Sequence, residues 1–274
     1  MPPEGAAPYP TIHFYGGMTF SNALYAELID EWNKRGYAVV VFQSTSERGE
    51  RYHCTDCEDL FCSWAWLQAR GTEYGLDPER TLSFAHGYGM FTLLMALGDE
   101  ALWDDFLTTC PQPTPASAEV KAVVTYDGLF GLPEGDLVQQ SWAMAATYGV
   151  PHEELLTIID ALQEAPPETW PHEGLLTAEA RRVASFLPLY YVNDPRPPGG
   201  VPSFLVMHGD EEQYYDFVCV DCSLMMAREI ADAMLPVETW HVEGGQWASI
   251  ISDGKVEIAD AVDAFAREVF GDDM

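Results

Sequence analysis

The sequence predicts an α/β fold with a mostly parallel central sheet and helices on both of its faces. Strand-like and helix-like segments alternate from residue 11 to residue 128, beginning and ending with a strand, which is typical of parallel strands joined by helical crossovers. The run YAVVVFQST (37–45) is rich in β-branched residues, as expected of a strand that is buried on both faces. The alternation resumes at residue 201 and continues to residue 270.

The elements of the first half follow one another in a regular order. TIHFYGG (11–17) is a short apolar strand that ends in a glycine pair. A helix is expected over 21–36, because apolar residues recur there at helical spacing. These residues are Leu24, Leu28 and Trp32, and Gly36 ends the pattern. The remaining elements are strands at 37–45, 80–87 and 120–128 and helices at 57–75 and 88–98.

Residues 134–186 interrupt this rhythm. The segment has helical patterning and is rich in Trp, Pro and acidic residues, and we interpret it as a helical cap inserted over the carboxyl ends of the strands. The predicted domains are therefore a core, formed by residues 1–133 and 187–274, and the cap insert at 134–186. The elements expected after the insert are strands at 201–212 and 237–245 and helices at 223–235 and 256–270.

The charge of the chain excludes several classes of partner. The sequence has 44 acidic and 13 basic residues, a formal net charge of −31, which would repel a phosphate backbone or an anionic membrane surface. No run of about 18 apolar residues occurs, so no membrane span is expected. Residues 1–10, MPPEGAAPYP, lack the basic and apolar regions of a secretory signal, so a cytoplasmic location is predicted.

The six cysteines leave their chemistry open. C-x-x-C spacing occurs twice, as CTDC (54–57) and CVDC (219–222), and the other two cysteines are Cys62 and Cys110. Two such pairs can build a tetrahedral zinc site, but the gap between them is far longer than in a zinc ribbon. Reduced thiols are favoured, while a zinc site or a disulfide between the two segments remains an alternative. No metal and no cofactor are predicted.

Four motifs in order resemble those of one large superfamily. They are FYGGM (14–18), YGLDPERTLSFAHGYGM (74–90), PLYYVNDPRPPGGVPSFLVMHGDEE (188–212) and VEGGQW (242–247). Over about residues 11–270 the chain resembles the α/β-hydrolase superfamily, and within it the carboxylesterases and acyl-peptide-hydrolase-like esterases. The resemblance implies the α/β-hydrolase fold with a helical cap. It also implies a nucleophile on a sharp strand-to-helix turn, with a histidine base, an acid and an oxyanion loop.

The resemblance assigns these roles to specific positions. The nucleophile position falls on Gly87, the acid on Glu212 and the base on Gln246. The oxyanion loop falls on Tyr15, Gly16, Gly17 and Met18. The remaining pocket positions are Tyr88, Tyr126, Asp127 and Trp247.

These positions predict that conventional ester hydrolysis is lost. Gly87 has no side chain to carry an acyl group, and Gln246 cannot serve as a general base near neutral pH. The histidines do not convincingly replace the base, because His86 and His208 are expected to be structural and His241 lies within a strand. Glu212 is left as the carboxyl group that can act as acid or base.

Three functions remain open from the sequence. The favoured one is a non-hydrolytic enzyme, such as a cyclase, isomerase, lyase or dehydratase, that acts on a small apolar molecule, as in a biosynthetic step. The second is a carboxylesterase-type serine hydrolase inactivated by deliberate substitution at Gly87, with or without a second substitution at Gln246. The third is a non-catalytic protein that binds a small molecule in the retained pocket.

Overall fold

The computed structural model describes the greater part of the predicted core. The described residues are 7–16, 22–42, 55–87, 89–98, 100–108, 110, 119–127, 200–209, 220–243 and 254–271. The predicted cap insert at 134–186 lies outside these residues, so the division into core and cap remains a prediction.

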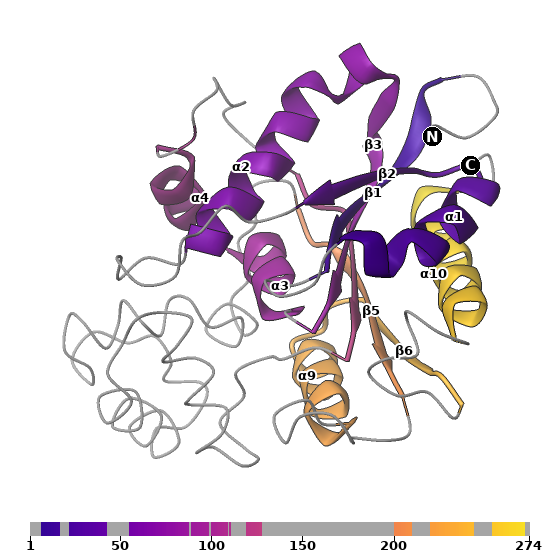
Figure 1. Cartoon of the computed structure of the whole chain (residues 1–274). Coiled ribbons are helices and arrows are strands. Elements are labelled where there is room, and N and C mark those ends of the chain that lie inside the picture. Colours follow the sequence, from indigo (N-terminus) through magenta and orange to yellow (C-terminus); the bar gives the residue numbers. More distant parts are fainter. Residues whose placement is uncertain are drawn as a thin grey trace, which may run out of the picture.

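The described strands form one parallel sheet in the order β2-β1-β3-β4-β5-β6 (Figure 1). Every pair of neighbouring strands is parallel, as the alternation of strands and helices predicts. The strands are β1 (Tyr9–Tyr15), β2 (Ala38–Phe42), β3 (Leu76–His86), β4 (Ala122–Tyr126), β5 (Ser203–His208) and β6 (Val237–His241).

Helices cover the sheet on both faces, which confirms the predicted fold class. Helices α1 and α10 lie together on one face, and α2, α3 and α4 group on the other (Figure 1). Helix α9 packs against β5 and β6. The α-helices are α1 (Ala26–Lys34), α2 (Thr55–Arg70), α3 (Gly89–Leu97), α4 (Glu100–Leu107), α9 (Val220–Asp232) and α10 (Lys255–Phe270), and short 3-10 turns occupy η1 (Asn22–Tyr25) and η2 (Gly71–Tyr74).

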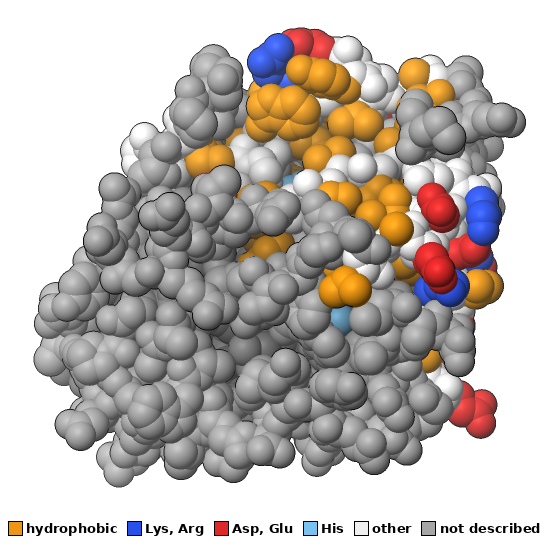
Figure 2. All heavy atoms as spheres, in the orientation of Figure 1, with side chains coloured by type: hydrophobic (Ala, Val, Ile, Leu, Met, Phe, Trp, Pro, Cys, Tyr) orange, Lys and Arg blue, Asp and Glu red, His pale blue; other side chains and the backbone are white. Residues whose placement is uncertain are grey.

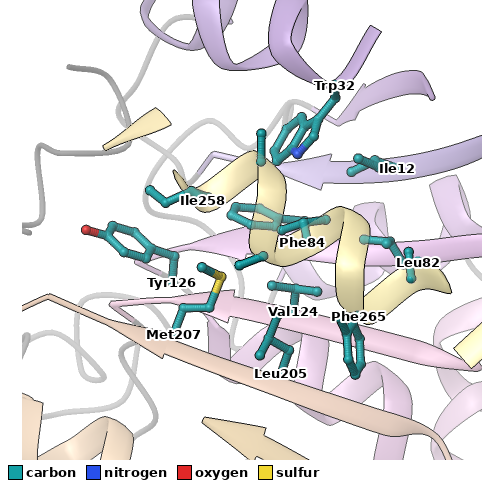
Figure 3. Close-up of a cluster of buried hydrophobic side chains, with 14 of the residues drawn as sticks. Ile12, Trp32, Leu82, Phe84, Val124, Tyr126, Leu205, Met207, Ile258 and Phe265 are labelled. Carbon is teal, nitrogen blue, oxygen red and sulfur yellow. The ribbon is translucent and has the colours of Figure 1, made fainter. Parts of the chain in front are cut away.

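A buried cluster fills the space between the sheet and the α1–α10 pair (Figure 3). Alternate residues of the central strands point into it, because successive side chains of a strand face opposite sides. The ring of Trp32 from α1 lies 5.6 Å from that of Phe14 and 5.0 Å from that of Phe84. The same cluster contains Ile12, Leu82, Val124, Tyr126, Leu205, Met207, Ile258 and Phe265.

The structure departs from the sequence prediction at three points. Leu24 is 45% exposed, because the chain forms a 3-10 turn there and the α-helix begins only at Ala26. Strand β2 is half-buried over Val39–Val41, because in the described sheet it pairs only with β1. Helix α4 was not anticipated, since eight residues offer too short a pattern to separate a helix from a loop.

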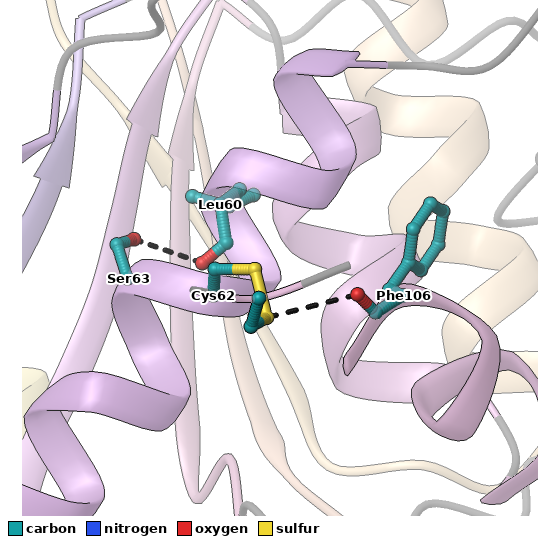
Figure 4. The surroundings of a disulfide bond; sticks show 5 residues. Leu60, Cys62, Ser63 and Phe106 are labelled. Atoms are coloured by element: carbon teal, nitrogen blue, oxygen red, sulfur yellow. Dashed lines mark hydrogen bonds between the residues drawn. A yellow bond between two sulfur atoms is a disulfide. The ribbon is translucent and has the colours of Figure 1, made fainter. Parts of the chain in front are cut away.

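A disulfide joins Cys62 in α2 to Cys110, which follows α4 (Figure 4). Reduced thiols were the favoured expectation for all six cysteines, and it is wrong for this pair. The Cα atoms lie 5.4 Å apart, within the normal range for a bridge. Beside the bridge, the ring of Phe61 packs against those of Trp103 and Phe106 at 4.4 and 4.5 Å. The side chains of both C-x-x-C pairs lie outside the described part of the chain.

The other face of the sheet buries a histidine. His13 of β1 is fully buried, and its Nε2 lies 2.8 Å from the Ser63 hydroxyl. That hydroxyl donates its proton to the Leu60 carbonyl, so His13 must be the donor in the shared hydrogen bond. Burial lowers the pKa of His13 to about 3, so the ring is neutral.

None of the helices in the described residues is long and apolar enough to cross a membrane. Hydrophobic side chains gather over the end of α2 (Figure 2), where the exposed Tyr74 packs on Trp66 with ring centres 5.3 Å apart. This group lies at the start of β3 and therefore at the opposite end of the sheet from the carboxyl ends of the strands.

Candidate functional site

The site predicted from the sequence corresponds to the carboxyl ends of the central strands. Gly16 follows β1, Gly87 follows β3, Asp127 follows β4 and Gly209 follows β5. Because the strands are parallel, these ends meet at one edge of the sheet, where ligands of open α/β sheets bind. The predicted residues within the described part are Tyr15, Gly16, Gly87, Tyr126 and Asp127, while Gly17, Met18, Tyr88, Glu212, Gln246 and Trp247 lie outside it.

Gly87 forms the turn between β3 and α3. Its φ is +77°, in the left-handed region that side chains disfavour. Its N–H donates to the Tyr126 carbonyl at 3.1 Å, and α3 begins two residues later at Gly89. This strand–turn–helix has the form expected of a nucleophile elbow. The assignment of the nucleophile position to Gly87 remains a prediction.

Tyr25 joins this turn to the loop that follows β1. Its hydroxyl donates to the Gly16 carbonyl at 2.8 Å and lies 2.9 Å from His86 Nδ1. Because the hydroxyl has a single proton, His86 Nδ1 must carry the hydrogen that it shares with Tyr25. Both side chains are 1% exposed, and burial raises the pKa of Tyr25 above its ordinary value. His86 is therefore structural, as expected.

The glycine at position 16 is required by this contact. A Cβ atom there would lie 2.5 Å from Cε2 of Tyr25 and 3.0 Å from Cζ, closer than two carbon atoms can pack. The absence of a side chain at Gly16 lets the tyrosine ring reach the backbone. The sequence motif identified this glycine but not its partner, because Tyr25 belongs to the helical pattern of residues 21–36.

Two aromatic residues of the predicted pocket are buried. Tyr15 is fully buried and packs against Phe42 with ring centres 5.2 Å apart. The ring of Tyr126 is also fully buried and lies in the core cluster (Figure 3), where it packs on His86 at 5.6 Å. Both residues therefore support the strand ends by packing.

Asp127 is the buried carboxyl group of the described site. It is 6% exposed and has a φ of +43°, which is unusual for a residue other than glycine. Its Oδ1 accepts the N–H of Gly209 at 3.1 Å, and its own N–H donates to the Met207 carbonyl at 3.0 Å. Burial raises the pKa of Asp127 to about 6, although hydrogen bonds from Gly209 and Tyr126 act in the opposite direction. Asp127 thus ties the end of β4 to the end of β5.

His208 closes the described edge beside Asp127. It is 8% exposed, and its Nδ1 lies 3.1 Å from the Gly209 carbonyl, an arrangement in which the ring nitrogen donates. Its ring stacks on that of His241 with centres 5.2 Å apart. The described residues contain no group of three or more His, Cys, Asp and Glu side chains that could hold a metal ion.

Several solved structures with a similar fold are esterases. The Thermogutta terrifontis esterase with bound propionate has a TM-score of 0.62 at 14% identity, covering 98% of this chain and 88% of that chain. Esterase B from Lactobacillus rhamnosis, inhibited by a tributyrin phosphonate, has a TM-score of 0.65 at 13% identity, covering 97% and 78%. The chain has the α/β-hydrolase fold.

The likeness extends to a further carboxylesterase on this fold. EstE1, cloned from a metagenomic library, has a TM-score of 0.60 at 17% identity, covering 98% of this chain and 83% of that chain. Comparisons with protein-family models and with curated proteins find no match. At these identities the structures establish the α/β-hydrolase fold, and the activity has to be argued from the residues at the edge of the sheet.

Proposed function

We propose that this α/β-hydrolase-fold chain binds a small, mainly apolar carbonyl compound and acts on it without forming an acyl-enzyme. It would be a non-hydrolytic enzyme of the cyclase, isomerase, lyase or dehydratase type. The observation that carries the proposal is the turn at Gly87, which keeps the left-handed backbone of an elbow and has no side chain to acylate. Catalysis would rest on positioning, hydrogen bonds and a carboxyl group.

The preference for a carbonyl group rests on the backbone around the turn. In hydrolases of this fold, N–H groups beside the elbow and in the oxyanion loop stabilise charge on a carbonyl oxygen. Here the hydrogen bonds of Tyr25 hold the start of that loop at Gly16 against the strand that carries the elbow. We propose that the N–H groups of Gly17 and Tyr88 are the donors, with Glu212 and Gln246 completing the polar part of the site.

Two other functions have specific support. All of the similar structures named above are esterases, which favours an esterase origin with replacements at positions 87 and 246. A binding protein without catalysis would use the same site and keep the same packing at its strand ends. The net charge of −31 disfavours nucleic acid and anionic membranes as partners in each case, and this remains a prediction.

Hydrolysis of p-nitrophenyl butyrate tests the loss of the acyl-enzyme route. The protein is compared with the double variant Gly87→Ser, Gln246→His and with Gly87→Ala, which adds a Cβ atom but no nucleophile. We expect hydrolysis at the background rate from the unchanged protein and from Gly87→Ala, and turnover only from the double variant. Enzyme-dependent hydrolysis by the unchanged protein would contradict the proposal and require another nucleophile.

Proton exchange separates an enzyme from a binding protein. A small ketone such as butanone is incubated with the protein in deuterated water, and exchange at the carbon next to the carbonyl is followed by NMR. A non-hydrolytic acid–base enzyme should accelerate this exchange, and Glu212→Gln should reduce it. Binding of butanone without any acceleration would favour the non-catalytic alternative.

A further inference from the structure

Asp127 combines three features that bear on its charge. Its carboxyl group is buried, its backbone has a positive φ, and its hydrogen-bond partners are the neutral groups of Gly209 and Tyr126. A residue other than glycine is uncommon in this backbone region and persists where the surroundings enforce it, often at functional sites. Among the described residues no cationic group bonds to this carboxyl group, and a buried carboxyl group is then costly to keep ionised.

Asp127 lies directly beside the turn at Gly87. The last paired residues of β3 and β4 are His86 and Tyr126, so Gly87 and Asp127 are the next residue of each strand. Neighbouring strands lie about 4.8 Å apart, and the Gly87 N–H to Tyr126 carbonyl hydrogen bond keeps the strand ends together. A ligand above the turn at Gly87 would therefore lie next to Asp127, the first residue after the neighbouring strand.

We propose that Asp127 is a specificity-determining residue that sets the charge of the ligand accepted at this site. When ionised, it rejects small carboxylates and leaves neutral carbonyl compounds able to bind. When protonated, it admits carboxylates as well. The inference rests on the proposed small-carbonyl site.

The Asp127 carboxyl group changes between its protonated and ionised forms in a physiological pH range. Burial raises the pKa of Asp127 to about 6, so the carboxyl group is mostly protonated below that pH and mostly ionised above it. Among the described residues, Tyr126 hydrogen-bonds to this carboxyl group, and His86 and His208 are the titratable residues at the ends of the neighbouring strands β3 and β5.

Ligand-observed NMR with a matched pair of probes tests the proposal. Butyrate and butyramide have the same carbon skeleton and differ in charge, and each is titrated into the full chain at about pH 5.5 and at about pH 8, on either side of the Asp127 transition. The variants are Asp127→Asn, which keeps an oxygen acceptor for Gly209 without the charge, and His208→Gln as the control for the neighbouring histidine. Thermal unfolding confirms that each variant is folded, and the unchanged protein alone already provides a test.

We expect butyrate to lose about tenfold or more in affinity between the lower and the higher pH, a size that like-charge repulsion in a partly solvated site can supply. Butyramide should change by less than about twofold over the same range. Asp127→Asn should bind butyrate at the higher pH as well as the unchanged protein does at the lower pH, and His208→Gln should keep the pH dependence.

Two results would overturn this inference while leaving the proposed site in place. The first is a butyrate affinity that does not change with pH. The second is a pH dependence that is assigned to the wrong residue, because it survives in Asp127→Asn or disappears in His208→Gln. If neither probe binds at either pH, the small-carbonyl site itself is refuted, and the charge selection by Asp127 with it.

Discussion

Removal of the Cys62–Cys110 disulfide should lower the stability of the fold substantially. The bridge closes a loop with a sequence separation of 48 residues. The chain-entropy relation for a loop of this length gives about 4 kcal/mol of stabilisation, chiefly by restricting the unfolded chain. This value is an upper bound on the loss. The rings of Phe61, Trp103 and Phe106 still pack α2 against α4 without the bridge, so the folded state itself should lose little.

Urea denaturation at neutral pH measures this loss. The double variant Cys62→Ala, Cys110→Ala is compared with the unchanged protein, each with and without reductant, and the double variant in reductant is the common baseline. The free energy of unfolding should fall by about 2–4 kcal/mol on removing the bridge. Equal stability of the oxidised protein and the double variant would refute the reasoning. Disulfides of this kind are rare in cytosolic proteins, so a demonstrated bridge would also weigh against the predicted cytoplasmic location.

Three further predictions concern single side chains. Gly16→Ala should cost about 1–3 kcal/mol of unfolding free energy, because its Cβ would meet the Tyr25 ring at 2.5 Å; an unchanged denaturation midpoint would contradict the contact. Asp127→Asn should stabilise the fold at about pH 8 by about 3 kcal/mol, because a pKa raised from 3.8 to about 6 makes the ionised carboxyl costly. That gain should vanish as the pH falls below 3.8, and urea denaturation across a pH series checks it. The pKa of His13 is lowered from 6.5 to about 3 by burial, so stability should fall by about 1.4 kcal/mol for each pH unit below 6.5 through this residue. Denaturation of His13→Gln should lack that slope, and ¹⁵N NMR of the ring in the unchanged protein should show it neutral at about pH 5.

Local patterns in the sequence predicted the fold well, because alternating strand and helix segments indicate a parallel sheet. The positions of Gly16 and Gly87 were also recognised, since each glycine follows a strand in a motif with fixed spacing. Both have physical reasons that the structure makes visible: a close approach at Gly16 and a positive φ at Gly87.

Long-range partners were not predictable in this way. Tyr25 looks like one more apolar residue of a helical pattern, and only the folded chain brings its hydroxyl to Gly16 and His86. The pairing of Cys62 with Cys110 has no local signal either, because the two residues are 48 positions apart and neither belongs to a C-x-x-C pair. The edge position of β2 depends on strand order, which the composition of one strand does not contain.

The Tyr25 hydroxyl also has a consequence for local unfolding. Because one buried hydroxyl bonds to both Gly16 and His86, opening either the loop after β1 or the end of β3 would take one of these two partners away from the Tyr25 hydroxyl. A buried polar group that loses a partner costs about 1–3 kcal/mol, so the two segments should open as one cooperative unit. Hydrogen exchange at the Gly87 amide should then report on the opening of both segments, the loop after β1 and the end of β3. Tyr25→Phe should speed that exchange without unfolding the core.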